Sequence, residues 1–556
     1  MEIQEKIVLI TGGANGIGYC TAQELLRSGA KVIVIVDLPD SNGENAAAEL
    51  GKEFGANRAI FLVGNVTNDK ELAACFDKAV ELLGPLDIII NNAGIINDAE
   101  WEPMVDINYK GVVRGTILGL NHMGKHKGGK GGTIINMSSI VGLQGNPLAP
   151  IYAGTQFAIL GFTSSLQTFY EKTGVRLLVI CPGLTSTNMA SKFMSSKTYA
   201  MDILDDEIAA KAMMTMESQS PEHVATAIAE LLEKGKNGTI FVSENNQLAY
   251  AVQLPCYSDL KVSILIKFHL PLHSKKHFLF LFKAIKDIEL PYYIMENVQN
   301  KTAIVTGGGS GIGYCITQEL LRNGAKRVAV IDLPIPRTHE ALNKLQAEFG
   351  KQRVILFECD ITKPEYEETF KKAVNALGGL DILVNNAGLV NDTNVEKTFA
   401  VNCVALIHGS LYGVNYMGKH KGGKGGTIVN IASSIAILRY AEVLPVYTAS
   451  KYAVVGFSQA FKDYYDKTDV RVLTMCPDMT NTAFPKTATF FDFIGMPTSW
   501  HNDFSASQSP TNVACGVVQF IQKGKNGAIW SVMLGERDEC VLHAHEFQPV
   551  TSVPVM

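Results

Sequence analysis

The chain carries one long sequence pattern twice. Residues 9–32 read LITGGANGIGYCTAQELLRSGAKV, and residues 304–328 read IVTGGGSGIGYCITQELLRNGAKRV. The stretch GKHKGGKGGTI at 124–134 returns letter for letter at 418–428. Tyr152 corresponds to Tyr447, 295 residues further along the chain. A repeat of this length describes two whole domains and not the short units of a solenoid.

Within each copy, short β-branched apolar runs alternate with segments of helical spacing. The runs KIVLITG, KVIVIVD and LDIIINN are typical of strands, and PEHVATAIAELLEKGKNG has one apolar helical face and a glycine stop. Continuous apolar strands separated by helices predict a parallel sheet that is covered on both faces. We therefore expect an α/β chain of two tandem doubly wound Rossmann-fold domains, with helices on both faces of each sheet.

The predicted domains are 1–254 and 296–556, joined by an atypical connector at 255–295. Residues 255–294 contain no glycine, whereas linkers are usually rich in glycine, proline or polar residues. Met295 then opens MENVQNKTAIVTGG, which resembles the N-terminal MEIQEKIVLITGG. Two alternatives stay open: neighbouring coding units joined across a translated non-coding stretch, or an added helical connector.

Composition excludes several classes of protein. With a net charge of −5 and 19% charged residues, nothing suggests a nucleic-acid partner. No run of about 18 uncharged apolar residues predicts a membrane span. The ten cysteines form no CxxC pair, which favours a reducing, cytoplasmic setting without disulfides or zinc. His269, His273 and His277 lie four apart, but we expect no metal site there.

The segment TGGANGIG follows a predicted strand and opens a predicted helix. Gly12, Gly16 and Gly18 allow a tight turn and a close approach of the backbone to a pyrophosphate at the helix N-terminus. The same glycines recur in the second copy as Gly307, Gly311 and Gly313. A dinucleotide site is therefore expected in each copy.

An aspartate ends the second predicted strand of each copy, Asp37 in the first and Asp332 in the second. A carboxylate there can accept hydrogen bonds from ribose hydroxyls and repels a 2′-phosphate. The residues that follow are Leu38 and Leu333, so neither copy has an arginine at this position to bind a 2′-phosphate. The pattern favours NAD over NADP. Asn65 and Asp360 end the third strands, where either side chain can accept a hydrogen bond from the adenine amino group.

With these residues in view, both copies resemble short-chain dehydrogenases/reductases. The resemblance covers about 1–250 and 297–545 and rests on TGxxxGIG, NNAG, a serine 13 places before a tyrosine, YxxxK, and a proline–glycine followed by threonines. Within the family, the insect alcohol dehydrogenases and 15-hydroxyprostaglandin dehydrogenases are the most similar groups. Ala149 and Leu444 stand where the prostaglandin enzymes carry a glutamine, which argues against a prostaglandin substrate.

The resemblance implies NAD(P) binding, oxidation of a secondary alcohol, and usually a dimer or tetramer. The residues implied to bind the cofactor are Gly12, Gly16, Ile17, Gly18, Asp37, Asn65, Asn91, Ala93, Gly94, Pro182, Gly183 and Thr187 in the first copy, and Gly307, Gly311, Ile312, Gly313, Asp332, Asp360, Asn385, Ala387, Gly388, Lys451, Pro477 and Thr482 in the second.

The implied catalytic residues of the second copy are Asn402, Ser434, Tyr447 and Lys451. The assignment of Ser434 over Ser433 rests on the 13-residue spacing. A tyrosine with a pKa of about 10 is a poor base at neutral pH, and a nearby ammonium favours the phenolate. The serine hydroxyl holds the substrate oxygen.

The first copy has Asn108, Ser139 and Tyr152, but Gln156 replaces the lysine. If the cation shifts the tyrosine pKa by about two to three units, activity should fall by about two to three orders of magnitude. The second copy differs elsewhere, because Asp478 stands where the first has Gly183. The aspartate could attract the oxidised nicotinamide ring or block it.

These observations predict an NAD-dependent dehydrogenase that interconverts a secondary alcohol and its ketone, with the chemistry mainly in the second copy. The regions at 188–220 and 483–508 indicate apolar or lipid-like substrates. The alternative is a non-catalytic NAD-binding or storage protein. We expect the two copies to pair within one chain, or whole chains to associate.

Overall fold

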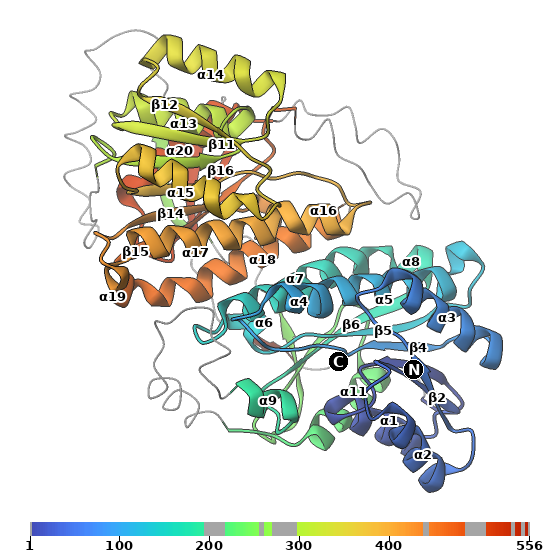
Figure 1. Cartoon of the computed structure of the whole chain (residues 1–556). Helices are drawn as coiled ribbons and strands as arrows, with labels where there is room; N and C mark the ends of the chain where they lie inside the picture. The colour runs from blue at the N-terminus through green and yellow to red at the C-terminus, as the bar shows by residue number, and fades with distance from the viewer. Residues whose placement is uncertain are drawn as a thin grey trace.

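A computed structural model describes residues 3–193, 217–254, 261–268, 297–437, 444–483, 507–534, 540–545 and 551–553. The two copies form two α/β domains, which Figure 1 shows as two lobes facing one another. Each lobe has a central sheet with helices on both faces. The predicted fold class is confirmed.

The first domain has seven parallel strands in the order β3-β2-β1-β4-β5-β6-β7. The β-branched runs seen in the sequence form these strands, and their interior residues are buried. The strands are β1 (Ile7–Thr11), β2 (Val32–Asp37), β3 (Ala59–Val63), β4 (Ile88–Asn91), β5 (Gly132–Met137), β6 (Val175–Pro182) and β7 (Ile240–Ser243). The main helices are α1 (Gly16–Arg27), α2 (Gly43–Phe54), α3 (Asp69–Leu83), α5 (Gly111–Met123), α7 (Pro150–Leu166) and α11 (Pro221–Lys234).

The second domain repeats this arrangement in the order β12-β11-β10-β13-β14-β15-β16. Its parallel strands are β10 (Thr302–Thr306), β11 (Arg327–Asp332), β12 (Val354–Glu358), β13 (Ile382–Asn385), β14 (Gly426–Ile431), β15 (Val470–Pro477) and β16 (Ile529–Leu534). Its main helices are α13 (Gly311–Arg322), α14 (Pro336–Phe349), α15 (Glu365–Leu377), α17 (Ala405–Met417), α18 (Pro445–Phe461) and α20 (Pro510–Lys523).

The sheets are not purely parallel, because antiparallel strands extend one edge of each. In the first domain, β8 (Tyr250–Gln253) pairs with β7, and the C-terminal strand β18 (Thr551–Val553) pairs with β8. In the second, β17 (Cys540–His545) pairs with β16, and β9 (Lys261–Phe268) pairs with β17. Part of the predicted connector thus belongs to the second sheet, and the end of the chain joins the first.

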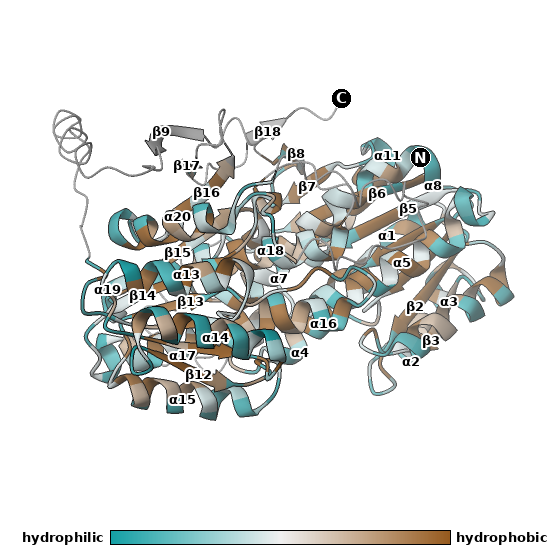
Figure 2. Cartoon of the chain, turned by 90° about the horizontal axis from the view of Figure 1, so that it is seen from above, coloured by the Kyte–Doolittle hydropathy of each residue, from teal (hydrophilic) through white to brown (hydrophobic). Residues whose placement is uncertain are grey.

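The two domains pack through α7 and α18, which carry the two tyrosines. Figures 1 and 2 both show these helices side by side, and one hydrophobic core cluster includes residues of both copies. Glycines permit the close approach: a Cβ added at Gly161 would lie 2.5 Å from the ring of Tyr452, and one at Gly456 would lie 2.4 Å from the ring of Phe157. The predicted pairing of the copies within one chain is present in the structure.

Candidate active sites

The glycine turn between β1 and α1 cannot accept side chains. Gly12 has φ +66°, and a Cβ there would lie 2.8 Å from the Cα of Ala93. A Cβ on Gly18 would lie 2.3 Å from the carbonyl oxygen of Gly12. In the second copy Gly307 has φ +67°, and a Cβ on Gly313 would lie 2.2 Å from the Gly307 oxygen. The backbone at this turn is therefore left bare beside a helix N-terminus.

The second asparagine of each NNAG segment holds this turn, a role that sequence reasoning missed. Asn92 Nδ2 donates to the carbonyl oxygens of Thr11 (3.1 Å) and Gly12 (2.9 Å). Asn386 Nδ2 donates to Thr306 (3.0 Å) and Gly307 (3.3 Å) in the same way. The sequence signal for this role was the pair of consecutive asparagines in each NNAG segment.

The first asparagine of NNAG lies elsewhere. Asn91 is buried, and its Nδ2 donates to Asn136 Oδ1 at 2.8 Å and to Thr116 Oγ1 at 3.2 Å. Asn385 makes the matching bonds to Asn430 and Ser410. These side chains join two strands to a helix beneath the sheet edge, and this placement gives no support to their predicted contact with a cofactor.

The two strand-end aspartates lie beside the glycine turn. Asp37 accepts hydrogen bonds from the amides of Ala14 (3.1 Å) and Leu38 (2.8 Å). Asp332 accepts from Gly309 and Leu333, both at 2.8 Å. Both carboxylates stay partly exposed, so their positions suit the predicted ribose contact while they also brace the turn.

Asn65 and Asp360 form local turns at the ends of β3 and β12. Asn65 Oδ1 accepts from the amide and hydroxyl of Thr67, each at 2.9 Å. Asp360 Oδ1 accepts from the amide (3.0 Å) and hydroxyl (2.7 Å) of Thr362. The change from amide to carboxylate leaves this turn intact.

The loop after β6 reaches the glycine turn. A Cβ on Gly16 would lie 3.4 Å from Thr187 Cγ2, and one on Gly311 would lie 3.3 Å from Thr482 Cγ2. Pro182 and Pro477 end the strands that lead to these loops, and Ile17 and Ile312 pack on the core from the first turns of α1 and α13.

Gly183 and Asp478 occupy equivalent positions after β6 and β15 but have different neighbours. A Cβ on Gly183 would lie 2.8 Å from Glu244 Cβ. In the second copy, the Asp478 carboxylate accepts a hydrogen bond from Ser434 Oγ at 2.9 Å. Ser434 therefore points to Asp478.

The predicted relay asparagines lie in wide, π-helical turns, η1 (Asp106–Lys110) and η5 (Ala400–Val404), which are frequent at functional sites. Asn402 is fully buried, accepts from the Leu389 amide at 2.8 Å, and donates to Ser450 Oγ at 3.0 Å. Asn108 accepts from Ile95 at 2.8 Å and donates to Thr155 Oγ1 at 3.5 Å. Both stand beside their NNAG glycines, since a Cβ on Gly94 or on Gly388 would lie 3.3 Å from the asparagine Oδ1.

Tyr447 and Lys451 lie one turn apart on the buried face of α18. Lys451 Nζ donates to the Ile431 carbonyl at 3.0 Å and lies 5.7 Å from the centroid of the Tyr447 ring. It also lies near the NNAG loop, 3.7 Å from where a Cβ on Gly388 would be. Asn402, Tyr447 and Lys451 are thus brought together at the carboxyl ends of β13 and β14.

The serine beside Tyr447 is Ser433 and not Ser434. Tyr447 is hydrogen-bonded to Ser433, as Tyr152 is to Ser139. The strand pairing supports the same correspondence. The Ser138 amide donates to the Ile180 carbonyl, and the Ala432 amide donates to the Met475 carbonyl at the equivalent point of the second sheet. The residues that follow, Ser139 and Ser433, therefore correspond. The extra residue of the second copy lies after this serine, which is why counting back from the tyrosine selected Ser434.

Burial dominates the pKa values in both sites. It raises the pKa of Tyr447 to about 12, and the hydrogen bond from Ser433 opposes it; the pKa of Tyr152 is also raised to about 12, with Ser139 opposing. Burial lowers the pKa of Lys451 to about 8. Burial thus acts alike on the two phenols, and the copies differ in the presence of a cation one helical turn after the tyrosine.

Gln156 takes the position of the lysine in the first copy. It is 4% exposed, its Nε2 donates to Thr155 Oγ1 at 3.2 Å, and its backbone carbonyl accepts from Ser138 Oγ at 3.1 Å. The side chain is held in place by neutral partners. Because Gln156 is neutral, this position places no positive charge near Tyr152.

A buried aspartate precedes each tyrosine helix, and sequence reasoning missed both. Asp98 accepts from the amides of Ile151 (2.7 Å) and Tyr152 (2.9 Å). Asp392 accepts from Val446 and Tyr447, each at 2.9 Å. The repeated ND in IINDAE and LVNDTN was the available signal.

The model of the short chain dehydrogenase family matches residues 6–198 and 301–489. Together these ranges cover more than half of the chain. Both copies belong to the short-chain dehydrogenases. The predicted family, the tandem duplication and the oxidoreductase class are confirmed.

Curated relatives of this short-chain dehydrogenase match about one half of the chain. 15-Hydroxyprostaglandin dehydrogenase [NAD(+)] of Mus musculus is 38% identical over 245 residues, which is 43% of this chain and 90% of the relative. Alcohol dehydrogenase 1 of Ceratitis cosyra is 28% identical over 45% of this chain and 95% of its own. Fat body protein 2 of Drosophila melanogaster is 28% identical over 44% and 93%.

Solved structures of similar fold include levodione reductase, with 25% identity and a TM-score of 0.39 over 44% of this chain and 98% of that one. A 3-ketoacyl-(acyl-carrier-protein) reductase from Brucella melitensis, complexed with NADH, has 21% identity and a TM-score of 0.38 over 44% and 98%.

Some predictions about this short-chain dehydrogenase fall outside the described residues. These are the three histidines of 269–277 and most of the two substrate regions, 188–220 and 483–508. Within the described ranges, no group of three or more His, Cys, Asp or Glu side chains could hold a metal ion. In the same ranges, no helix is long and apolar enough to cross a membrane.

Proposed function

We propose that the chain is an NAD-dependent dehydrogenase that interconverts a secondary alcohol and its ketone, with turnover in the second copy. The observation that carries this proposal is the grouping of Ser433, Tyr447 and Lys451 near the NNAG loop that packs on the glycine turn, against Gln156 in the first copy. The relatives named as alcohol and NAD-dependent dehydrogenases support the reaction class.

The glycine turn fits a dinucleotide. The positions of Gly307 and Gly313 have no room for a side chain, and Ser310, the N-cap residue that precedes α13, makes no side-chain capping bond. Backbone amides of the turn and helix would hold the pyrophosphate, Asp332 the ribose, and Lys451 the nicotinamide end. Bound NAD would supply the hydride acceptor.

Three residues of the second copy prepare the alcohol for oxidation. The Ser433 hydroxyl fixes the substrate oxygen, and Tyr447 accepts its proton as general base. Lys451 retains a positive charge below a pH of about 8 and favours the phenolate by attraction across a buried site. In the first copy Gln156 offers no charge, so we infer cofactor binding with little turnover.

The preference for NAD and the domain limits 1–254 and 296–556 remain part of the proposal. Asp332 and Leu333 support NAD, since a carboxylate repels a 2′-phosphate and no basic side chain follows it. Alcohols of apolar or lipid-like character are the proposed substrates.

The test is reduction of NAD+ and NADP+ by the full chain with a panel of secondary alcohols, short-chain and long-chain. We expect NADH formation and at least a tenfold lower kcat/KM with NADP+. Tight NAD binding without turnover on any alcohol would contradict the proposal and favour the non-catalytic alternative. In that alternative Asp478 has disabled the second site.

A further inference from the structure

The second site has a carboxylate at a position where the first copy has a glycine. Asp478 directly follows β15, and Ser434 Oγ donates to its Oδ1 at 2.9 Å. Strand β15 pairs with β14, and Ser433, which bonds Tyr447, stands just beyond the end of β14. Neighbouring strands lie about 4.8 Å apart. Asp478 is therefore next to the serine that is proposed to hold the substrate oxygen.

The aspartate does not displace the backbone at this strand end. The amide of Asp478 donates to the Val532 carbonyl at 2.9 Å, and the amide of Gly183 donates to the Ser243 carbonyl at 2.8 Å in the first copy. The strand ends of the two copies are thus held in the same way. The difference between them is the side chain that the second copy adds.

Another acid fills the corresponding space in the first copy. A Cβ on Gly183 would lie 2.8 Å from Glu244 Cβ, and the Glu244 carboxylate accepts a hydrogen bond from the Tyr250 hydroxyl. The pairing of β6 with β7 and of β15 with β16 makes Met533 the equivalent of Glu244. The second copy has therefore lost this acid from one strand end and gained Asp478 at the next.

The residue that contacts this position also differs between the copies. In the first copy, Ile140 Cδ1 would lie 3.7 Å from a Cβ on Gly183. In the second copy, Ser434 stands in the place of Ile140 and donates to Asp478. An isoleucine there would offer the carboxylate no hydrogen bond. Glycine and isoleucine have thus been replaced by a bonded pair of polar residues at the carboxyl ends of the strands.

The protein supplies no counter-charge for Asp478. Across the described ranges, no lysine, arginine or histidine forms an ion pair with it, and Ser434 is the only side chain that bonds its carboxylate. The nearby cation Lys451 donates to the Ile431 carbonyl. Asp478 is partly exposed, and its Oδ2 keeps its capacity to accept hydrogen bonds. A partly buried carboxylate of this kind suits a ligand that carries a positive charge.

We propose that Asp478 is a specificity-determining residue of the second site, which selects alcohols that carry an ammonium group on the carbon beside the carbinol. Ser433 holds the substrate hydroxyl, and the ammonium group donates to Asp478 on the neighbouring strand end. Hydrogen bonds between charged partners are the stronger ones. This inference rests on the proposed function, because it names the substrate class of the same site.

The test compares two alcohols of the same shape with the full chain. 1-Amino-2-octanol is an alkylammonium at about pH 7, and 3-nonanol has a methyl group in place of the amine. Asp478→Asn should lower the ratio of kcat/KM for the amine to kcat/KM for 3-nonanol by about 10-fold to 100-fold. The value for 3-nonanol itself should fall by less than about threefold. The change in the ratio between variants cancels the intrinsic reactivity of the two alcohols.

Matched variants separate selectivity from structure. The double variant Asp478→Gly, Ser434→Ile restores the residue pair of the first copy and should lose selectivity as Asp478→Asn does. Glu244→Gln neutralises the acid of the first copy and should leave the ratio within about twofold of wild type. An equal loss with both alcohols in Asp478→Asn would mean that Asp478 only supports the structure, and would overturn the proposal.

The oxidised nicotinamide ring is also positively charged, so cofactor binding is measured separately. Calorimetric titration with NAD+ and NADH should give wild type and Asp478→Asn the same ratio of Kd values within about twofold. A changed ratio with unaltered alcohol selectivity would assign Asp478 to the cofactor and overturn the proposal.

A binding measurement keeps the inference distinct from the proposed function. If wild type oxidises no alcohol, the proposed function fails, and calorimetry of the two alcohols with the NAD-loaded chain decides about Asp478. Tighter binding of 1-amino-2-octanol that Asp478→Asn abolishes would support its role. Equal binding of the two alcohols to wild type would overturn it.

Discussion

At the scale of single residues, the serine of the second site shows where counting along the sequence fails. Counting back from Tyr447 selects Ser434, whereas the strand register from Asn430 selects Ser433. The inserted residue lies between the strand and the helix, so the strand pairing is needed to show which serine corresponds to Ser139. Ser433 lies with Tyr447, and Ser434 is bonded to Asp478.

Substitution of the two serines should separate them. Ser433→Ala should lower kcat by about 100-fold, because the substrate oxygen loses its hydrogen-bond donor in a buried site. Ser434→Ala should cost less than about threefold, since it removes only the bond to Asp478. Steady-state kinetics on one secondary alcohol give both values. The reverse order would restore the assignment made from the 13-residue spacing.

Other residues of the site were predictable to different degrees. Gly12 and Gly18 were predictable from the sequence, because glycines at a strand-to-helix turn indicate a backbone that is too tightly packed to accept a Cβ. The cofactor contact expected of Asn91 stays a prediction: its side chain bonds to Asn136, and the side chain of its neighbour Asn92 holds the glycine turn. Asp98 was missed because its partner amides lie more than 50 residues away in the sequence.

The buried aspartates should give the protein a pH-dependent stability. Burial raises the pKa of Asp98 and of Asp392 to about 7 in the folded chain, with the two amide bonds opposing, against about 3.9 when unfolded. Between these values the folded state binds more protons, so stability falls as pH rises from about 4 to about 7.

Asparagine at these positions does not titrate. Relative to wild type, the melting temperatures of Asp98→Asn and Asp392→Asn should therefore improve as pH increases from 5 to 8. Thermal unfolding at four pH values measures this difference. A difference that stays constant with pH would mean that neither carboxyl titrates in this window.

At the scale of elements, α7 and α18 were predictable as buried helices but not as partners. Segments such as IYAGTQFAILGF are apolar on all sides, which indicates burial without naming the neighbour. The same holds for β9 and β18, whose pairing with distant sheet edges has no local sequence signal. The parallel strands, with their continuous apolar runs, were predictable from the sequence.

The helix pair should be sensitive to added volume. Gly456→Ala places a methyl group 2.4 Å from the Phe157 ring across the interface and should destabilise the chain by about 1–3 kcal/mol. Gly51→Ala in α2 has open space around it and should be neutral or stabilising by up to about 1 kcal/mol. Melting temperatures of the two variants provide the comparison. Equal stability would show that α7 and α18 do not pack as described.

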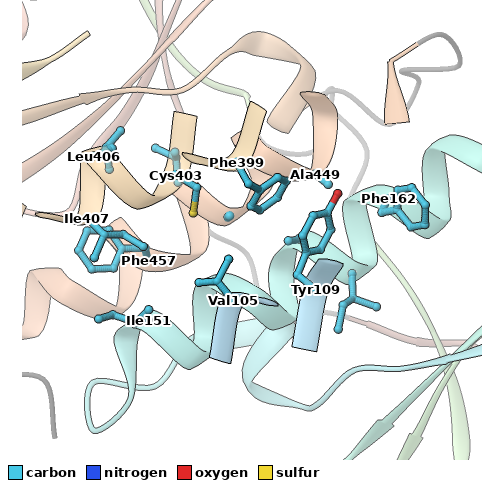
Figure 3. Packing of buried hydrophobic residues seen from close by; sticks show 14 of the residues in the cluster. Val105, Tyr109, Ile151, Phe162, Phe399, Cys403, Leu406, Ile407, Ala449 and Phe457 are labelled. Carbon is cyan, nitrogen blue, oxygen red and sulfur yellow. The ribbon is translucent and has the colours of Figure 1, made fainter. Parts of the chain in front are cut away.

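At the scale of the whole molecule, two related domains pack through the helices that carry their tyrosines, with one core cluster shared between them (Figure 3). The long repeat predicted two Rossmann domains correctly because it preserves both the apolar periodicity and the glycine turns. The proposed division of labour between the copies depends on one position, Gln156 in α7 and Lys451 in α18.

Turnover after exchange at this position tests that division most directly. In the full chain, Lys451→Gln should lower NADH formation from a secondary alcohol by about two to three orders of magnitude, because the second site loses its cation. Adding Gln156→Lys to that variant should raise activity again, now from the first copy. Unchanged activity in Lys451→Gln would contradict the account.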